Sequence, residues 1–346
     1  MAAASTSFPS LKELSYKTCM RDPDTSLSCF IQDNLKRYSA LCASFSERCL
    51  YFDCSELSSL FDPDKVCILT TGSDGREEKA SRNESPIELI LYINVKDKEQ
   101  VKIISAKIEA YIAKKPHFFQ ILDIKSEESS LYKMLEKVMP ARPLHAKFLL
   151  GTKENLEKYT IQTVREIRSI SPKDLKKFRV DFCNSHLAQL KKCLEGTEDQ
   201  SISFKNNTIS YDGKNFKKRS TKYVALRVVQ YNLDLIICNY LKEIPEEEAI
   251  AFLKAMPRTT HELIEFLYKR QVLQGLTYEE VKTLQKSYDL CLIYFHFMQN
   301  LYEASHLEVT LKLNDANMQK VRESLKNIQV IIQKIKDFKF LPIKPA

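Results

Sequence analysis

The chain carries two kinds of hydrophobic pattern, which divide it into an α/β part and a helical part. Between about residues 60 and 152, short apolar runs typical of strands are separated by stretches with helical spacing. Strands are expected at Val66–Thr70, Ile87–Val95, Phe118–Lys125 and Ala146–Leu150, with a helix from Val101 to Tyr111. This interleaving predicts a small mixed sheet with helices packed on it.

From Ser171 onward, apolar residues recur every three or four positions, as they do in amphipathic helices. Ser171, Thr259 and Thr277 are the expected N-caps of three of these helices. Helical spacing also runs from Leu27 to Phe45. We therefore expect an α+β, mostly helical protein with three parts, which are a tail and helix at 1–55, an α/β domain at 56–160 and a helical bundle at 161–346.

Composition narrows the class of protein. The 346 residues are 44% hydrophobic and 28% charged, and the lack of an 18-residue apolar run argues against a membrane span. The net charge of +8 suits an anionic ligand but is too small to indicate nucleic acid. Ten cysteines without a CxxC pair predict buried thiols in a cytoplasmic protein. The Ala/Ser-rich start also occurs on secreted effectors, so that alternative stays open.

The stretch from Thr70 to Tyr92, TTGSDGREEKASRNESPIELILY, carries the candidate chemistry. A turn at Gly72 and Ser73 between two strands gives a phosphate access to backbone N–H groups and to a hydroxyl. Arg76 is placed to neutralise the phosphate, and Glu88 on the next strand to hold Mg²⁺ against it. By itself, the same pattern also fits a plain connecting turn.

GSDGREE resembles the GSxGRxE element of the nucleotidyltransferase family found beside CBS domains in bacterial regulators. That family is related to PII uridylyltransferase within the polymerase-β-like superfamily. Similar motifs follow in order at 145–159, at 215–233 and from Arg258 to Gln299. The resemblance implies a nucleotidyltransferase-like domain followed by a helical bundle. It also implies transfer of a nucleoside monophosphate from an NTP, with Mg²⁺, to a hydroxyl of a protein or small molecule.

The resemblance assigns catalytic roles to Glu88, Asp123 and Arg76, and metal binding to Glu88 and Asp123. It also implies a departure, because Pro86 stands where the family has its first metal-binding Asp and offers no ligand atom. A two-metal mechanism needs ligands that bridge both ions. The alternative function is therefore an inactive relative that serves as a nucleotide sensor or a regulatory protein-interaction module. As structural alternatives, Glu88 is a solvated strand residue and Asp123 a strand-end acid.

A basic segment, Lys214–Lys222, precedes one of the expected helices. Lys217 and Lys218 are candidates for binding the phosphates of a nucleotide or an acidic regulatory protein, and a solvated loop is the alternative. Phe216 is the only aromatic among the basic residues, which argues against single-stranded nucleic acid. The whole interpretation requires Gly72 to lie in a turn rather than a helix, with the Glu88 carboxylate pointing at it.

Overall fold

The computed structural model describes residues 61–78, 87–114, 119–126, 143–197, 201–213 and 221–337. These residues form two compact units. The described part of the first, the four-strand unit, lies within Ser39–Cys183 and Gln230–Leu276 and includes the end of the last helix. The described part of the second, the three-strand unit, lies within Asn184–Val229 and Thr277–Lys334.

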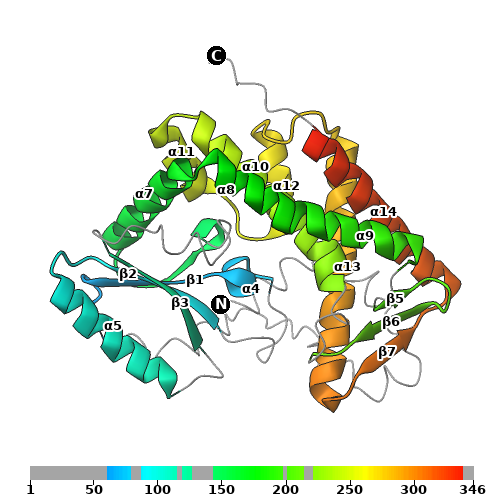
Figure 1. Ribbon diagram of the computed structural model, residues 1–346, viewed down its shortest axis with the longest axis horizontal. Coiled ribbons are helices and arrows are strands. Elements are labelled where there is room, and N and C mark those ends of the chain that lie inside the picture. The colour runs from blue at the N-terminus through cyan, green and yellow to red at the C-terminus, as the bar shows by residue number, and fades with distance from the viewer. Residues whose placement is uncertain are drawn as a thin grey trace, which may run out of the picture. The chain divides into compact units, whose positions relative to one another are not determined.

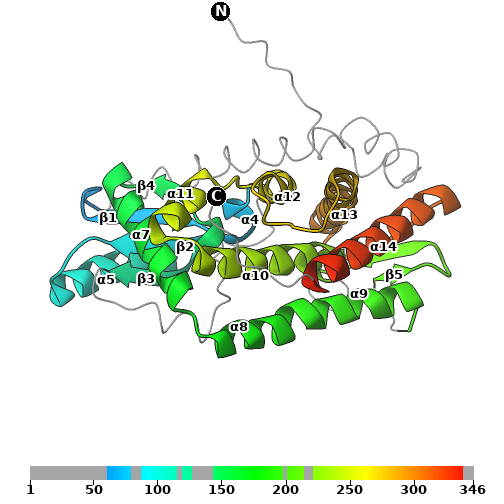
Figure 2. The same cartoon turned by 90° about the horizontal axis from the view of Figure 1, so that it is seen from above.

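The sheet of the four-strand unit has the order β3-β2-β1-β4 (Figures 1 and 2). Its strands are β1 (Val66–Thr70), β2 (Ile87–Ile93), β3 (Phe119–Ser126) and β4 (Lys147–Leu150). β1 is antiparallel to both of its neighbours, whereas β2 and β3 are parallel. The four strands expected from the sequence are confirmed, and so is the mixed sheet.

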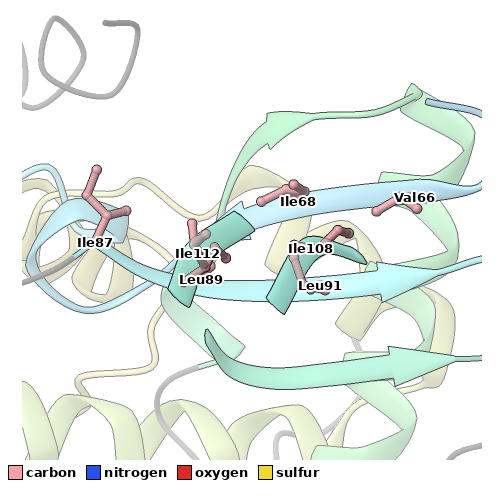
Figure 3. Packing of buried hydrophobic residues seen from close by; sticks show 7 residues of the cluster. All are labelled: Val66, Ile68, Ile87, Leu89, Leu91, Ile108 and Ile112. Carbon is pink, nitrogen blue, oxygen red and sulfur yellow. The ribbon is translucent and has the colours of Figure 1, made fainter. Parts of the chain in front are cut away.

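One helix covers each face of this sheet, because alternate strand residues point to opposite sides. Helix α5 (Lys98–Ala113) packs on one face, and α7 (Lys153–Ser169) packs on the other through Tyr159 (Figure 1). Figure 3 shows the cluster on the α5 side, which consists of Val66, Ile68, Ile87, Leu89, Leu91, Ile108 and Ile112. The α7 side contains Cys67, Leu69, Ile90 and Tyr92. Glu88 alternates in step with Ile90 and so belongs to the α7 side of β2.

Several helical segments complete the four-strand unit. They are η2 (Pro143–His145), α8 (Pro172–Phe178), most of the π-helical η3 (Arg179–Asn184), α10 (Arg227–Glu243) from Gln230 onward, α11 (Glu246–Ala255) and α12 (Thr260–Lys269). Ser171 caps α8 as predicted, since its hydroxyl accepts from the Asp174 N–H at 3.1 Å. Helix α11 lies beside α7 (Figure 2), where Arg165 pairs with Glu246 at 2.8 Å.

The three-strand unit corrects the expectation of an all-helical second part. Its helical segments are α9 (Ser185–Glu195), η5 (Thr221–Leu226), α13 (Tyr278–Ser305) and α14 (Asp315–Asp337). They are accompanied by an antiparallel sheet of β5 (Ile202–Ser203), β6 (Thr208–Tyr211) and β7 (Val309–Lys312). Residues of β7 are alternately buried and exposed, a period of two within a stretch expected to be helical.

The predicted helical seams are confirmed in this unit. The α14 residues Met318, Val321, Leu325, Ile328 and Ile332 are all buried. Thr277 is the N-cap of α13, as predicted, and forms a capping box with Glu280. The buried residues of these helices therefore recur with the 3.6-residue period that the sequence predicts.

The structure also contradicts the turn expected at Gly72 and Ser73. Residues Gly72–Gly75 form a one-turn helix, α4, in which the Gly75 and Arg76 N–H groups bond to the Thr71 and Gly72 carbonyls at 3.1 Å. Gly72 begins this helix with a φ of +69°, so a left-handed residue turns the chain and the helical turn follows at once.

The division into units does not follow the expected boundary at residue 160. Boundaries fall between Cys183 and Asn184, inside η3, and between Val229 and Gln230, inside α10. The expected helix at 27–45 lies outside the described residues. Within the described ranges, no helix is long and apolar enough to cross a membrane.

The described cysteines are free and buried, as expected for thiols that act as small apolar residues: Cys67, Cys183, Cys193, Cys238 and Cys291. Burial raises the pKa of Cys67 and of Cys193 to about 12. These two thiols are therefore poor nucleophiles at neutral pH.

Candidate functional site

The end of β1 and the start of β2 meet at Gly72, and a carboxylate points at the meeting place. Thr71 donates its N–H to the Glu88 carbonyl at 2.9 Å, which holds the two strands together there. A Cβ atom at residue 72 would overlap Oε2 of Glu88, so the carboxylate occupies the space that the glycine leaves free. The expected direction of Glu88 is confirmed, although Gly72 lies in a helical turn.

Gly75 provides a second close approach in the same segment. A Cβ at this position would overlap the carbonyl oxygen of His145, and it would also crowd the Thr70 carbonyl. Only glycine lets the α4 backbone lie this close to the segment that leads into β4. The two glycines of GSDG therefore bring the motif against two different parts of the unit.

Arg76 and Glu78 form an ion pair in the interior of the four-strand unit. Arg76 Nε donates to Glu78 Oε2 at 3.1 Å, and the side chains are only 8% and 4% exposed. Glu78 also accepts from the Thr260 N–H at 2.8 Å and from Gln230 Nε2 at 3.1 Å. Glu78 therefore anchors the motif to α10 and to the start of α12, and its carboxylate matches the charge of Arg76 inside the protein.

The residue between them, Glu77, faces a more open place with two cations. Its carboxylate pairs with Lys147 at 2.6 Å, and each side chain is 20% exposed. Arg258, two residues before α12, donates from Nη1 to the Ala146 carbonyl at 2.6 Å. Burial lowers the pKa of Arg258, while the Glu77 carboxylate and Tyr159 act in the opposite direction.

A buried pair links the segment before β4 to α10. His145 Nε2 lies 2.7 Å from Asp234 Oδ1, with side chains 3% and 4% exposed. The charged residues around GSDGREE thus form a network in which three segments, 72–78, 145–147 and 258–260, meet one another and α10.

The sequence-predicted site residues are only partly brought together. Ser73 is half-buried, and its hydroxyl and N–H have no hydrogen-bond partner among the described residues. The Asp123 backbone pairs with Ile90, two positions beyond Glu88 on the neighbouring strand, but its side chain lies outside the described part. Pro86, Lys217 and Lys218 also lie outside it.

A magnesium ion would find one defined ligand at this corner. Mg²⁺ is commonly held by one or two protein carboxylates together with phosphate oxygens and water. Glu88 supplies one such carboxylate, and no cluster of three or more His, Cys, Asp or Glu suited to a metal occurs within the described ranges. One carboxylate does not make a magnesium site by itself, so Mg²⁺ at this corner would need oxygens from a bound ligand.

In comparisons with known proteins, no protein-family model and no curated protein matches the chain.

Sequence reasoning missed most of this network. Glu78 is the last residue of the GSxGRxE pattern but was assigned no role, and Glu77, Asp234 and Arg258 were not singled out. The spacing of the two glutamates after Arg76 was the available signal, because adjacent residues leave the chain in different directions. Nothing in the sequence indicates that Asp234 lies next to His145, 89 positions away.

Proposed function

We propose that the four-strand unit binds a nucleoside triphosphate at the corner formed by Gly72, Ser73 and Glu88, and that the chain is a nucleotide-responsive regulatory module of the nucleotidyltransferase type. The observation that carries this proposal is the Glu88 carboxylate, which fills the space beside the missing side chain of Gly72. The motif series from GSDGREE onward resembles the same class of protein. Of the two conditions set for that resemblance, the direction of Glu88 is met and the turn at Gly72 is not, because Gly72 begins the helix α4. The proposal therefore depends on the contact between Glu88 and Gly72 rather than on the motif series.

The corner has the donors that a phosphate chain needs. The Gly72 and Ser73 N–H groups and the Ser73 hydroxyl have no acceptor among the described residues. Phosphate oxygens readily accept from backbone N–H groups of this kind. Glu88 would repel the same phosphates unless a divalent cation lay between them, so the proposal requires Mg²⁺ together with the nucleotide.

The properties of two residues favour a regulatory, nucleotide-binding role over catalysis of nucleotidyl transfer. Pro86 has no atom for a metal, and the Arg76 charge is used inside the protein by Glu78. Charge neutralisation of the transferring group is the main task of a phosphoryl-transfer site. A corner with one defined carboxylate and an internally paired arginine is better suited to binding than to transfer.

Titration calorimetry of the full chain with ATP and with UTP tests this proposal, with and without Mg²⁺. We expect binding that depends on Mg²⁺ and weakens at least tenfold in Glu88→Gln, a variant that keeps the shape of the side chain. Glu99→Gln, on the exposed side of α5, is the matched control and should bind as the unaltered chain does. Absence of binding, or equal binding by Glu88→Gln, would overturn the proposal.

Nucleotidyl transfer is the second candidate, favoured by the position of Asp123. Its backbone lies beside Ile90, close in register to Glu88, where a second acid would serve as a metal ligand. In that reaction, a hydroxyl oxygen bonds to the α-phosphorus while the bond to pyrophosphate breaks. Pyrophosphate release that Asp123→Asn abolishes would establish transfer, and nucleotide binding without release would leave the regulatory function.

A further inference from the structure

Glu77, Lys147 and Arg258 form a second charged site, away from the Gly72–Glu88 pair. Lys147 projects from β4 and Arg258 from the segment before α12, so different parts of the chain supply the two cations. The Arg258 guanidinium is bonded to the carbonyl of residue 146, the neighbour of Lys147. All three side chains are half-buried, which leaves them within reach of solvent.

The backbone of Glu77 is in an unusual conformation for its residue type. Its φ is +57°, and it follows the one-turn helix α4 at a position where glycine or asparagine is common. The left-handed conformation is unfavourable for a residue with a side chain. The ion pair with Lys147 is the contact that a glycine could not make there.

The charges at this site do not balance. Lys147 and Arg258 bring two positive charges, and Glu77 brings one negative charge. The one hydrogen bond that Arg258 makes with described residues goes to the Ala146 carbonyl, although a guanidinium has five N–H donors. A half-buried arginine with donors to spare beside a lysine favours a further anion with several oxygens.

We propose that Lys147 and Arg258 form a binding site for a phosphate-ester or polyphosphate anion, and that Glu77 takes the place of this anion when the protein is free. Arginine binds phosphate through a planar pair of N–H groups and lysine as a compact charge, so the two complement each other. On binding, the Glu77 carboxylate leaves Lys147 for solvent, and the anion accepts from Lys147 Nζ and from the remaining Arg258 donors.

This site requires neither Glu88 nor a divalent cation, so it can be tested apart from the nucleotide-binding proposal. The probe is sodium tripolyphosphate, titrated calorimetrically into the full chain with chelator present. We expect saturable binding that weakens at least tenfold in Lys147→Met and in Arg258→Met. Lys254→Met is the matched control, because it removes a lysine from an exposed ion pair of the same unit and should leave binding unchanged.

Substitution of Glu77 is the more discriminating test, because it should strengthen tripolyphosphate binding, whereas substitution of Lys147 or Arg258 should weaken it. If Glu77 competes with the ligand, Glu77→Gln binds tripolyphosphate severalfold more tightly than the unaltered chain. If Arg258→Met fails to fold, Arg258→Lys keeps the charge and loses the planar pair of donors, and weaker binding is again expected. Tighter binding of metal-free ATP than of tripolyphosphate would identify a nucleotide as the ligand, and the reverse would identify inorganic polyphosphate.

Three results would overturn the inference. They are failure of tripolyphosphate to bind, binding that is unaffected by Lys147→Met and the Arg258 variants, and weaker binding by Glu77→Gln. None of these results bears on whether Mg²⁺ and a nucleotide bind at Glu88.

Discussion

Gly72 and Gly196 have nearly the same backbone conformation but different surroundings. Their φ angles are +69° and +68°; Gly72 is the first residue of α4, and Gly196 is the C-cap of α9. A Cβ at residue 72 would overlap the Glu88 carboxylate, whereas one at residue 196 would meet nothing within 4 Å. The pair therefore separates the cost of a left-handed conformation from the cost of a steric clash.

We expect Gly196→Ala to lower the free energy of unfolding by about 1 kcal/mol, the conformational cost alone. Gly72→Ala should cost about 2–4 kcal/mol, because the added methyl group also displaces Glu88. Urea denaturation of each variant measures the difference. Equal losses for both variants would show that Glu88 does not lie against Gly72.

Glu78 is expected to matter more for stability than any exposed acid. It accepts three hydrogen bonds in the interior, one of them from Arg76. Glu78→Gln would remove the carboxylate that pairs with the buried Arg76 charge, and removing one member of a buried ion pair costs about 3–5 kcal/mol.

The control for this prediction is Glu99→Gln, which removes an ion pair with Lys102 whose side chains are 72% and 73% exposed. That pair should contribute about 0.5 kcal/mol or less. Chemical denaturation compares the two, and a small effect of Glu78→Gln would contradict the structural role given to the motif.

At the scale of elements, the start of α13 is held by Thr277 and Glu280. The Thr277 hydroxyl accepts from the Glu280 N–H at 3.2 Å, and the Glu280 carboxylate accepts from the Thr277 N–H at 2.7 Å. Lys334 of α14 also donates to this carboxylate at 2.8 Å. Thr277→Ala should lower the free energy of unfolding by about 1 kcal/mol, as measured by urea denaturation.

The same cap should respond to pH. The hydrogen bond from Lys334, followed by the one from the Thr277 backbone, lowers the pKa of Glu280 from its ordinary value of 4.5. The stabilisation is therefore fully present above about pH 4.5 and is lost as the pH falls through the lower folded-state pKa. As the pH falls from about 5 to about 3, the free energy of unfolding of the unaltered chain should decrease more than that of Glu280→Gln. Parallel pH curves for the two proteins would contradict this assignment.

Elements with strong periodicity were predictable from sequence, whereas contacts between distant segments were not. The four strands of the first sheet and the stripes of α13 and α14 follow from periods of 2 and 3.6 residues. Strands β5 and β6 were missed because they have only two and four residues in a polar stretch. The prediction of a turn at Gly72 was wrong, because a glycine permits a turn but does not prevent a helix from starting there.

The candidate site shows the same limit. The direction of Glu88 was predictable, because alternation on β2 fixes the face of each residue. The pairing of Arg76 with Glu78 was not, since it depends on α10 and α12 packing against the motif. From the positive charge of Arg76 alone, the sequence suggested a phosphate ligand, whereas the structure pairs Arg76 with Glu78.

At the scale of the whole molecule, the four-strand unit needs residues far beyond the expected boundary at 160. Gln230, Asp234, Arg258 and Thr260 all bond to the segments around the motif. A fragment spanning 56–160 lacks them, so Glu78 loses its hydrogen bonds from Gln230 and Thr260, and His145 loses its contact with Asp234. We expect this fragment not to unfold cooperatively, as followed by circular dichroism, whereas a fragment spanning 56–276 should. Cooperative unfolding of the short fragment would contradict the division into units.

The most direct test of nucleotide binding at the corner uses the six glycines of the chain. Selective ¹⁵N labelling of glycine gives one amide signal from each of these positions: Gly72, Gly75, Gly151, Gly196, Gly213 and Gly275. Titration with MgATP or MgUTP should shift the Gly72 signal saturably while Gly196, Gly213 and Gly275 serve as internal references. We predict that the shift is lost in Glu88→Gln. Saturation with either nucleotide that leaves the Gly72 signal in place, or moves it equally in Glu88→Gln, would contradict the central claim.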